Sequence, residues 1–157
     1  MSGLPEVHEL VVLAEGSWPD AGDDGDPPAL PGFVLSAFSP LAAVAAERCL
    51  SRVAERTART GIVLVSDGDG VSAEHVRRTV AEGKRLGPLF FFQSVPNSVA
   101  GWIAARWDLR GPVVCVTDGG YDEAALLIGD GDADQVLIVQ VGAGQASAVI
   151  VSRGEPT

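Results

Sequence analysis

The chain has 157 residues, enough for one domain with a sizeable core, and a formal net charge of −10. Hydrophobic residues make up 46% of it and aromatic residues only 6%, so a core of Ala, Val and Leu is expected. The acidic excess argues against partners that carry phosphate, because nucleic acids and anionic membranes both require a basic surface.

The two cysteines, Cys49 and Cys115, form neither a disulfide framework nor a metal-binding pattern, and no metal or cofactor is expected. The first ten residues lack the basic and apolar regions of a signal peptide. No apolar run approaches the ~20 residues that span a bilayer. A cytoplasmic location is therefore expected.

The N-terminal part predicts a strand over Val7–Leu13, with Val11 to Leu13 buried, followed by a loop over residues 15–32. Acids, prolines and glycines dominate this loop, which suits a mobile surface segment. A calcium loop is a poorer interpretation, because the closing Glu of an EF-hand is missing. Trp18 is expected to pack back on the body or to meet a partner.

The next part predicts a helix, a strand and a second helix. Ser39 is the expected N-cap and Pro40 the first helical residue of a helix that continues through residues 41–58. A strand over Ile62–Val65 leads to a Gly/Asp turn that lacks the Lys of a phosphate-binding loop. The helix over residues 73–87 carries His75 on its polar side.

The last part alternates helices and strands around a pair of glycines. Apolar residues at helical spacing end at Gly111-Pro112, and a β-branched run indicates a strand buried on both faces. Gly119-Gly120 then turns the chain into another helix. The expected elements are a helix ending at Trp107, a strand Val113–Val116, a helix Tyr121–Ile128, a strand Val136–Val141 and an antiparallel strand Ala146–Ser152.

This succession resembles the N-terminal half of β-ketoacyl synthases, in the thiolase-like superfamily. The residues that carry the resemblance are, in order, Asn97, Ala100-Gly101, Gly111-Pro112, Val113–Thr117 and the turn Gly131–Asp134. The resemblance implies an α/β fold with a five-stranded mixed sheet in the order 3-2-1-4-5. Its last strand would be antiparallel, helices would cover both faces, and residues 1–157 would form a single domain.

The chain departs from the family at the positions of the catalytic residues. Counted from Gly111-Pro112, the position of the nucleophilic Cys falls on Gly120, which has no side chain to attack a thioester. Cys115 lies earlier, inside the strand, where a buried thiol is expected to be unreactive. The family's two catalytic histidines come from a half without counterpart here, since His8 and His75 lie in other regions.

The resemblance also implies that the chain is not a monomer. In the family the helix after the elbow belongs to a layer shared by two halves, and the strand edge Gly111–Thr117 is the dimer seam. A homodimer, or a heterodimer with a ketosynthase-like protein, is expected. The expected interface residues are Ala100, Gly101, Ala104, Val113, Val114 and Val116.

Three functions remain open from the sequence. The first is a non-catalytic ketosynthase-like partner or accessory subunit in polyketide or fatty-acid-type biosynthesis. The second is a divergent acyl-transfer enzyme that uses Cys115, Asp118 or Tyr121 at the elbow. The third is a binding module that holds an acyl or carboxylate ligand with Asn97 and the backbone N–H groups of Gly119 and Gly120.

Overall fold

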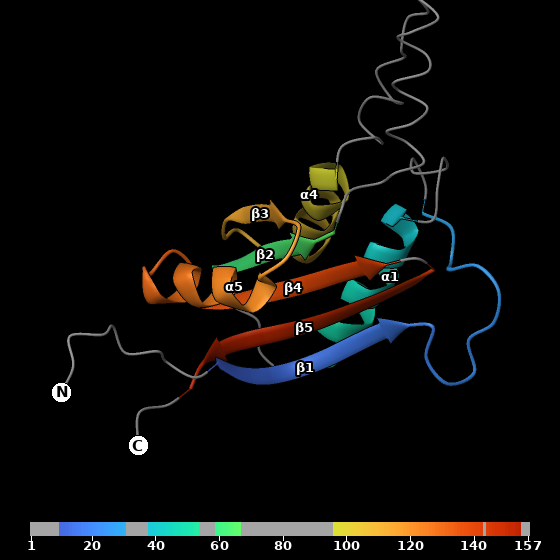
Figure 1. Ribbon diagram of the computed structural model, residues 1–157, viewed down its shortest axis with the longest axis horizontal. Coiled ribbons are helices and arrows are strands. Elements are labelled where there is room, and N and C mark those ends of the chain that lie inside the picture. The colour runs from blue at the N-terminus through green and yellow to red at the C-terminus, as the bar shows by residue number, and fades with distance from the viewer. Residues whose placement is uncertain (1–9, 31–37, 54–58, 67–95, 143, 155–157) are drawn as a thin grey trace, which may run out of the picture.

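A computed structural model describes residues 10–30, 38–53, 59–66, 96–142 and 144–154, which form one sheet with helices on both faces (Figure 1). The strands are β1 (Leu10–Trp18), β2 (Thr60–Val65), β3 (Val113–Val116), β4 (Gln135–Gly142) and β5 (Gln145–Arg153), and the helices are α1 (Phe38–Leu50), α4 (Pro96–Trp107) and α5 (Gly120–Gly129). The predictions for His8, residues 54–58, the turn at 67–70, the helix over 73–87 and His75 lie outside the described residues.

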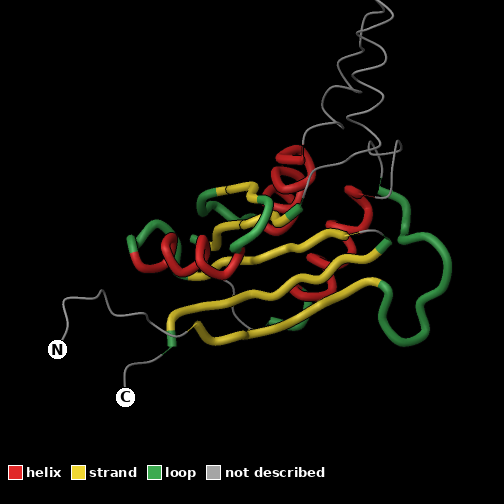
Figure 2. Tube along the Cα trace, viewed as in Figure 1, coloured by secondary structure: helices red, strands yellow, loops and turns green. Residues whose placement is uncertain are grey.

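The strands lie in the order β1-β5-β4-β2-β3 (Figure 2). β2 is parallel to β3 and β4, whereas β5 is antiparallel to β4 and to β1. The predicted α/β fold, with a five-stranded mixed sheet and an antiparallel last strand, is confirmed. The first strand has a different place from the one expected, because the order 3-2-1-4-5 put it between β2 and β4. These two strands pair directly along Thr60–Val65 and leave no room between them.

The position of β1 at the edge of the sheet corrects the expected burial of Val11 to Leu13. These side chains are 44%, 45% and 39% exposed, because an outer strand has a neighbour on one side only. A register shift between Val12 and Ala14 leaves Leu13 without a partner residue on β5. β1 also continues through Glu15 to Trp18, so the loop predicted over 15–32 begins only after Trp18.

Alternate residues of the inner strands face opposite sides of the sheet, as the two-residue repeat of a strand requires. On β2, Ile62 and Leu64 pack with α1 and α4, whereas Val63 and Val65 pack with α5. On β4, Leu137 and Val139 face the α1–α4 side. The chain therefore has two cores, one on each face, and both depend on the same strands.

Helix α1 is buried almost all round and lies tightly against the sheet. It begins at Phe38, which puts the predicted N-cap Ser39 inside the helix, and it ends at Leu50, not at residue 58. A turn follows, closed by bonds from the N–H groups of Arg52 and Val53. A Cβ at Gly16 of β1 would lie 2.4 Å from the backbone nitrogen of Cys49, so this close approach requires glycine there.

Gly111-Pro112 ends the helical pattern as predicted and also allows β3 to start beside β2. The Gly111 N–H donates to the Thr60 carbonyl at 3.0 Å, and the Ile62 N–H donates to the Pro112 carbonyl at 2.8 Å. A Cβ at Gly111 would lie 2.6 Å from the Gly61 nitrogen. The glycine therefore serves backbone contact between two parallel strands.

Trp18 packs back on the body, which is one of the two outcomes expected for it. Its side chain is 7% exposed, and the Arg48 guanidinium lies 4.7 Å from the ring centroid. Arg48 also donates to the Ser17 carbonyl and to both carboxylate oxygens of Asp23. The hydrogen bond from Arg48 lowers the pKa of Asp23 to about 2. The start of the acidic loop is thus fixed to the end of α1.

No helix among the described residues is long and apolar enough to cross a membrane.

Candidate functional site

The turn between β3 and α5 is the candidate site, because the resemblance locates the family's nucleophile there. Gly119 adopts a left-handed conformation with φ of 71° and caps α5 without any side-chain hydrogen bond. Its carbonyl accepts the N–H of Glu123 at 3.0 Å, which closes the first turn of the helix. The predicted sharp elbow at Gly119-Gly120 is therefore present.

The elbow has no room for a side chain at position 120. A Cβ on Gly120 would lie 2.7 Å from Val65 Cγ2 and 3.0 Å from Ile138 Cγ2. The contact with Val65 is closer than carbon atoms tolerate and the contact with Ile138 is unusually tight, and both partners are β-branched side chains with little freedom to move. Gly120 thus brings the start of α5 onto the sheet. At Gly119 a Cβ would meet only Asp122 Oδ2, at 3.9 Å, but the positive φ disfavours any other residue.

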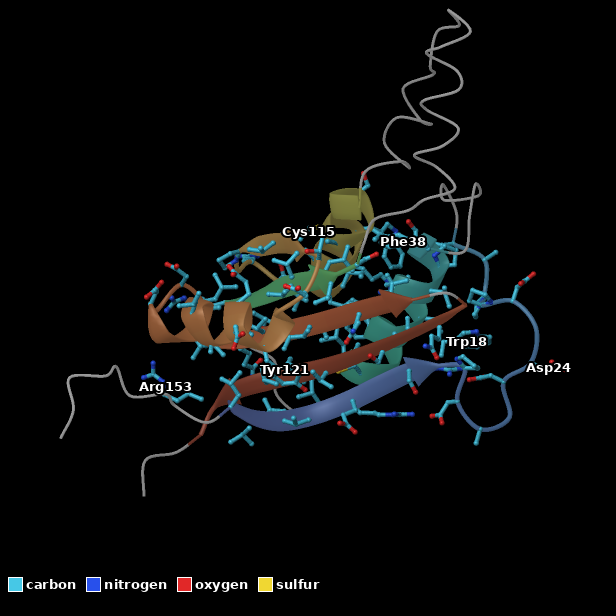
Figure 3. All side chains as sticks on the ribbon, viewed as in Figure 1. Trp18, Asp24, Phe38, Cys115, Tyr121 and Arg153 are labelled. Carbon is cyan, nitrogen blue, oxygen red and sulfur yellow. The ribbon has the colours of Figure 1, made fainter. Side chains whose placement is uncertain are left out.

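The weak catalytic candidates are not brought together at this elbow. Cys115 pairs with Leu64, whose side chain belongs to the α1–α4 face, so its thiol lies on the face opposite α5. Figure 3 shows Cys115 and Tyr121 well apart. Asp118 and Tyr121 are exposed, Tyr121 by 52%. The Cys115 thiol therefore does not share the elbow with Asp118 and Tyr121.

Cys115 is exposed at the edge of the sheet, which corrects the expectation that its strand is buried on both faces. The reason is the position of β3, which among the described strands pairs with β2 alone. Partial desolvation raises the pKa of the Cys115 thiol, so the reactive thiolate is disfavoured at neutral pH. Cys49 is buried, donates its thiol to the Ala14 carbonyl and has a pKa raised to about 11 by burial.

The remaining predicted site residues lie on α4 and β3. Asn97 is in the first turn of α4. Ala100 is fully buried in the chain's own core, and Ala104 is half-buried. Gly101 is exposed, and a Cβ there would meet nothing within 4 Å. The glycine at 101 is therefore not required by contacts within the described chain.

On β3 the four residues alternate between the two faces. Val113 is 38% exposed on the α4 side, and Val114 and Val116 are half-buried against the α5 core. Of the six residues predicted for an interface, Gly101 and Val113 are therefore the ones with the most accessible surface. Among the described residues, no group of three or more His, Cys, Asp or Glu side chains could hold a metal.

One polar row of the sheet was missed from the sequence. Ser17, Ser147 and Gln140 lie side by side across β1, β5 and β4. Gln140 interrupts the otherwise apolar run of β4, and this was the available signal. Nothing in the sequence indicates that Ser17 and Ser147 lie beside Gln140, because their position depends on the strand order.

Comparison with known proteins supports the fold. No protein-family profile and no curated protein matches the sequence. Among solved structures, the chain is similar to one in the complex of the ketosynthase ApeO with its chain length factor ApeC from Xenorhabdus doucetiae. The TM-score is 0.69 at 20% identity, over 92% of this chain and 79% of that one.

Two further structures lead to the same conclusion. The ishigamide ketosynthase/chain length factor matches with a TM-score of 0.60 at 19% identity, over 82% of this chain. A β-ketoacyl synthase from Burkholderia phymatum STM815 matches with a TM-score of 0.66 at 11% identity, over 94%. The chain spans 47% and 59% of these two proteins. The chain therefore shares its fold with these ketosynthase structures and spans about half the length of the last two.

Proposed function

We propose that this chain is a non-catalytic ketosynthase-like protein that acts as a partner or accessory subunit in polyketide or fatty-acid-type biosynthesis. The observation that carries the proposal is the elbow at Gly120, where Val65 and Ile138 fill the space that a nucleophilic side chain would need. Similar structures include a ketosynthase bound to its chain length factor, a precedent for one thiolase-like chain that pairs with another. A single cytoplasmic domain belongs to the same proposal.

The edge at β3 supports a partner of this kind. In the described sheet β3 pairs on one side only, and it exposes Val113 and Cys115 on the same face. Exposed edge strands with apolar residues are templates for pairing with another strand. Gly101 on the neighbouring helix leaves open space in which a second chain can approach closely. A second copy or a ketosynthase-like protein is the proposed occupant.

The solution mass tests this proposal. The chain of 16.2 kDa is measured alone and mixed with a ketosynthase, and a complex larger than the monomer is expected in at least one case. Val113→Lys should abolish that complex, because a desolvated ammonium group in a strand pair is costly. Val11→Lys is the matched control, since Val11 has similar exposure on the opposite edge. A monomer under both conditions, or equal behaviour of the two variants, contradicts the proposal.

Absence of catalysis has its own test. The folded chain is incubated with an electrophilic acyl-thioester analogue and examined by mass spectrometry. No adduct is expected under conditions that label an active ketosynthase, because the raised pKa of Cys115 keeps its thiol protonated. The Cys115→Ser variant serves as control. Rapid, stoichiometric labelling that Cys115→Ser abolishes would show that the chain is an acyl-transfer enzyme.

A further inference from the structure

A depression of about 380 Å³ lies at one end of the sheet, and neither glycine of the elbow lines it. Three consecutive residues from each of three neighbouring strand ends form it. These residues are Ser17–Pro19 at the end of β1, Gln140–Gly142 at the end of β4 and Gln145–Ser147 at the start of β5. Its volume lies within the range of about 300–1,000 Å³ that is common for small-molecule sites.

Strand pairing determines which side of the sheet the depression opens on. Ser17 pairs with Ser147, and Ser147 pairs with Gln140, so their side chains share one face. Ile138, two residues before Gln140, packs in the α5 core, which places the row on the α5 side.

Among the described residues, α5 does not line the depression. α5 begins above Val65 and Ile138, and because Val65 pairs with Gln140, the helix starts beside the β2 end of this row. Figure 3 shows Trp18 at the end of β1, away from Tyr121 at the start of α5. The adjacent row of paired residues consists of Trp18, Ala146 and Val141. Their side chains are buried on the α1 side, and their backbone faces the depression. Within the part of the chain that the structure describes, the site is therefore a part of the α5 face that no helix covers.

The lining determines the chemistry of a ligand. The side chains of Ser17, Gln140, Gln145 and Ser147 supply hydroxyl and amide groups, and none of the described residues that line the depression is ionisable. None of these four side chains makes a hydrogen bond to the described part of the chain. Asp20 follows directly after Pro19, and the chain carries a net charge of −10. Neutral groups that accept or donate hydrogen bonds fit this lining, whereas anions are repelled.

One wall is held in place from outside the depression. Arg48 lies over the Trp18 ring, donates to the Ser17 carbonyl at 2.9 Å and pairs with Asp23. This fixes Ser17, Trp18 and Pro19 before any ligand arrives, and a preformed wall lowers the entropic cost of binding. Arg48 thus acts as a positioning residue.

We propose that this depression binds an uncharged small molecule that carries carbonyl or amide groups. The site lies on the same face as the elbow but does not use it, and the proposal is independent of any partner at β3. Ser17, Gln140, Gln145 and Ser147 bind the polar groups of the ligand, and the ring of Pro19 contacts its apolar part.

The test is an NMR titration of the full chain with a matched pair of probes. N-acetyl-glycylglycine N-methylamide is uncharged, and N-acetyl-glycylglycine carries a carboxylate on an otherwise similar skeleton. The amide should shift the backbone resonances of residues 17, 18, 140–142 and 145–147, and the carboxylate should bind at least ~10-fold more weakly. Shifts confined to other residues, or equal affinity for the two probes, overturn the proposal.

Variants locate the binding groups. Gln140→Leu and Ser147→Ala replace exposed side chains, and each should weaken binding of the amide several-fold while the unfolding midpoint stays unchanged. Ser152→Ala is the matched control on the same strand, away from the depression. Unchanged affinity in both variants contradicts the proposal, whatever the oligomeric state of the chain. If a variant fails to fold, the comparison of the two probes on the parent chain still decides.

Discussion

The two faces of the sheet differ in how completely the chain covers them. On one face α1 and α4 form a core with Ile103, Leu137 and Ile150, all fully buried. On the other face α5 is the one described helix that covers β2 and β4, and large apolar side chains are exposed at Tyr121 (52%), Leu126 (59%) and Val12 (45%). Within the described chain, the first face is covered over its inner strands, whereas Val113 and Cys115 remain exposed on it at β3. The second offers surface for a ligand or another protein, and the same strands support both.

The largest expected effect compares two neighbouring residues of β4 that face opposite sides. Leu137→Ala should cost about 2–5 kcal/mol in the free energy of unfolding, because it opens a cavity under two helices. Ile138→Ala should cost roughly 1 kcal/mol less, since the thinner α5 layer can relax into the space. Urea unfolding of both variants measures the difference. Equal costs would mean that the two faces are equally rigid.

Gly120→Ala should destabilise the α5 face by about 1–3 kcal/mol, because the added methyl group overlaps Val65 and Ile138. Gly129→Ala in the same helix is the control, since a Cβ there meets nothing within 4 Å and alanine favours a helix. Thermal unfolding of both variants provides the comparison. The double variant Gly120→Ala/Val65→Ala should cost less than the sum of its single changes. Strict additivity would argue against the overlap.

Leu126→Lys tests whether the open part of α5 is covered in solution. In an isolated chain the substitution should change the free energy of unfolding by no more than about 0.5 kcal/mol, because the side chain is 59% exposed. If a second protein covers this helix, the charge should instead weaken the complex and lower its apparent mass. Sedimentation of the parent and the variant at equal concentration separates these outcomes.

The smallest expected effect concerns the acid range. The pKa of Asp23 is about 2 in the folded chain against an ordinary value of 3.8, so its pair with Arg48 stabilises the fold above the ordinary value. That contribution is lost as the pH falls through about 2. Between about pH 5 and pH 2 the unfolding midpoint of the parent should therefore fall more than that of Asp23→Asn. Parallel curves would show that the pair does not contribute.

Local signals in the sequence were sufficient for the elements around the elbow. The bounds of β3 agree with the prediction, and the Gly119-Gly120 turn and the antiparallel last strand are confirmed. The burial of Val11 to Leu13 could not be predicted, because an apolar run looks the same in an inner strand and in an exposed outer one. The prediction that Cys115 is buried was wrong for the same reason, because β3 is also an outer strand.

The depression at the ends of β1, β4 and β5 could not be predicted from the sequence, for a different reason. Ser17, Gln140 and Ser147 are far apart in the sequence and become neighbours only through the order β1-β5-β4. The order expected from the resemblance put the first strand elsewhere, so these side chains could not be grouped. A site whose residues become neighbours only through strand pairing can be predicted only after the strand order is known.

The antiparallel pair of β1 and β5 bears on how the chain is made. Among the described strands, β1 pairs with β5 alone, so β1 has no partner among them when it leaves the ribosome and must wait until β5 has emerged. Contacts between such distant segments slow folding, and an unpaired apolar strand is prone to aggregate in the meantime. Nascent chains of this protein should therefore gain protease resistance only once Arg153 is outside the exit tunnel, and should depend on chaperones until then.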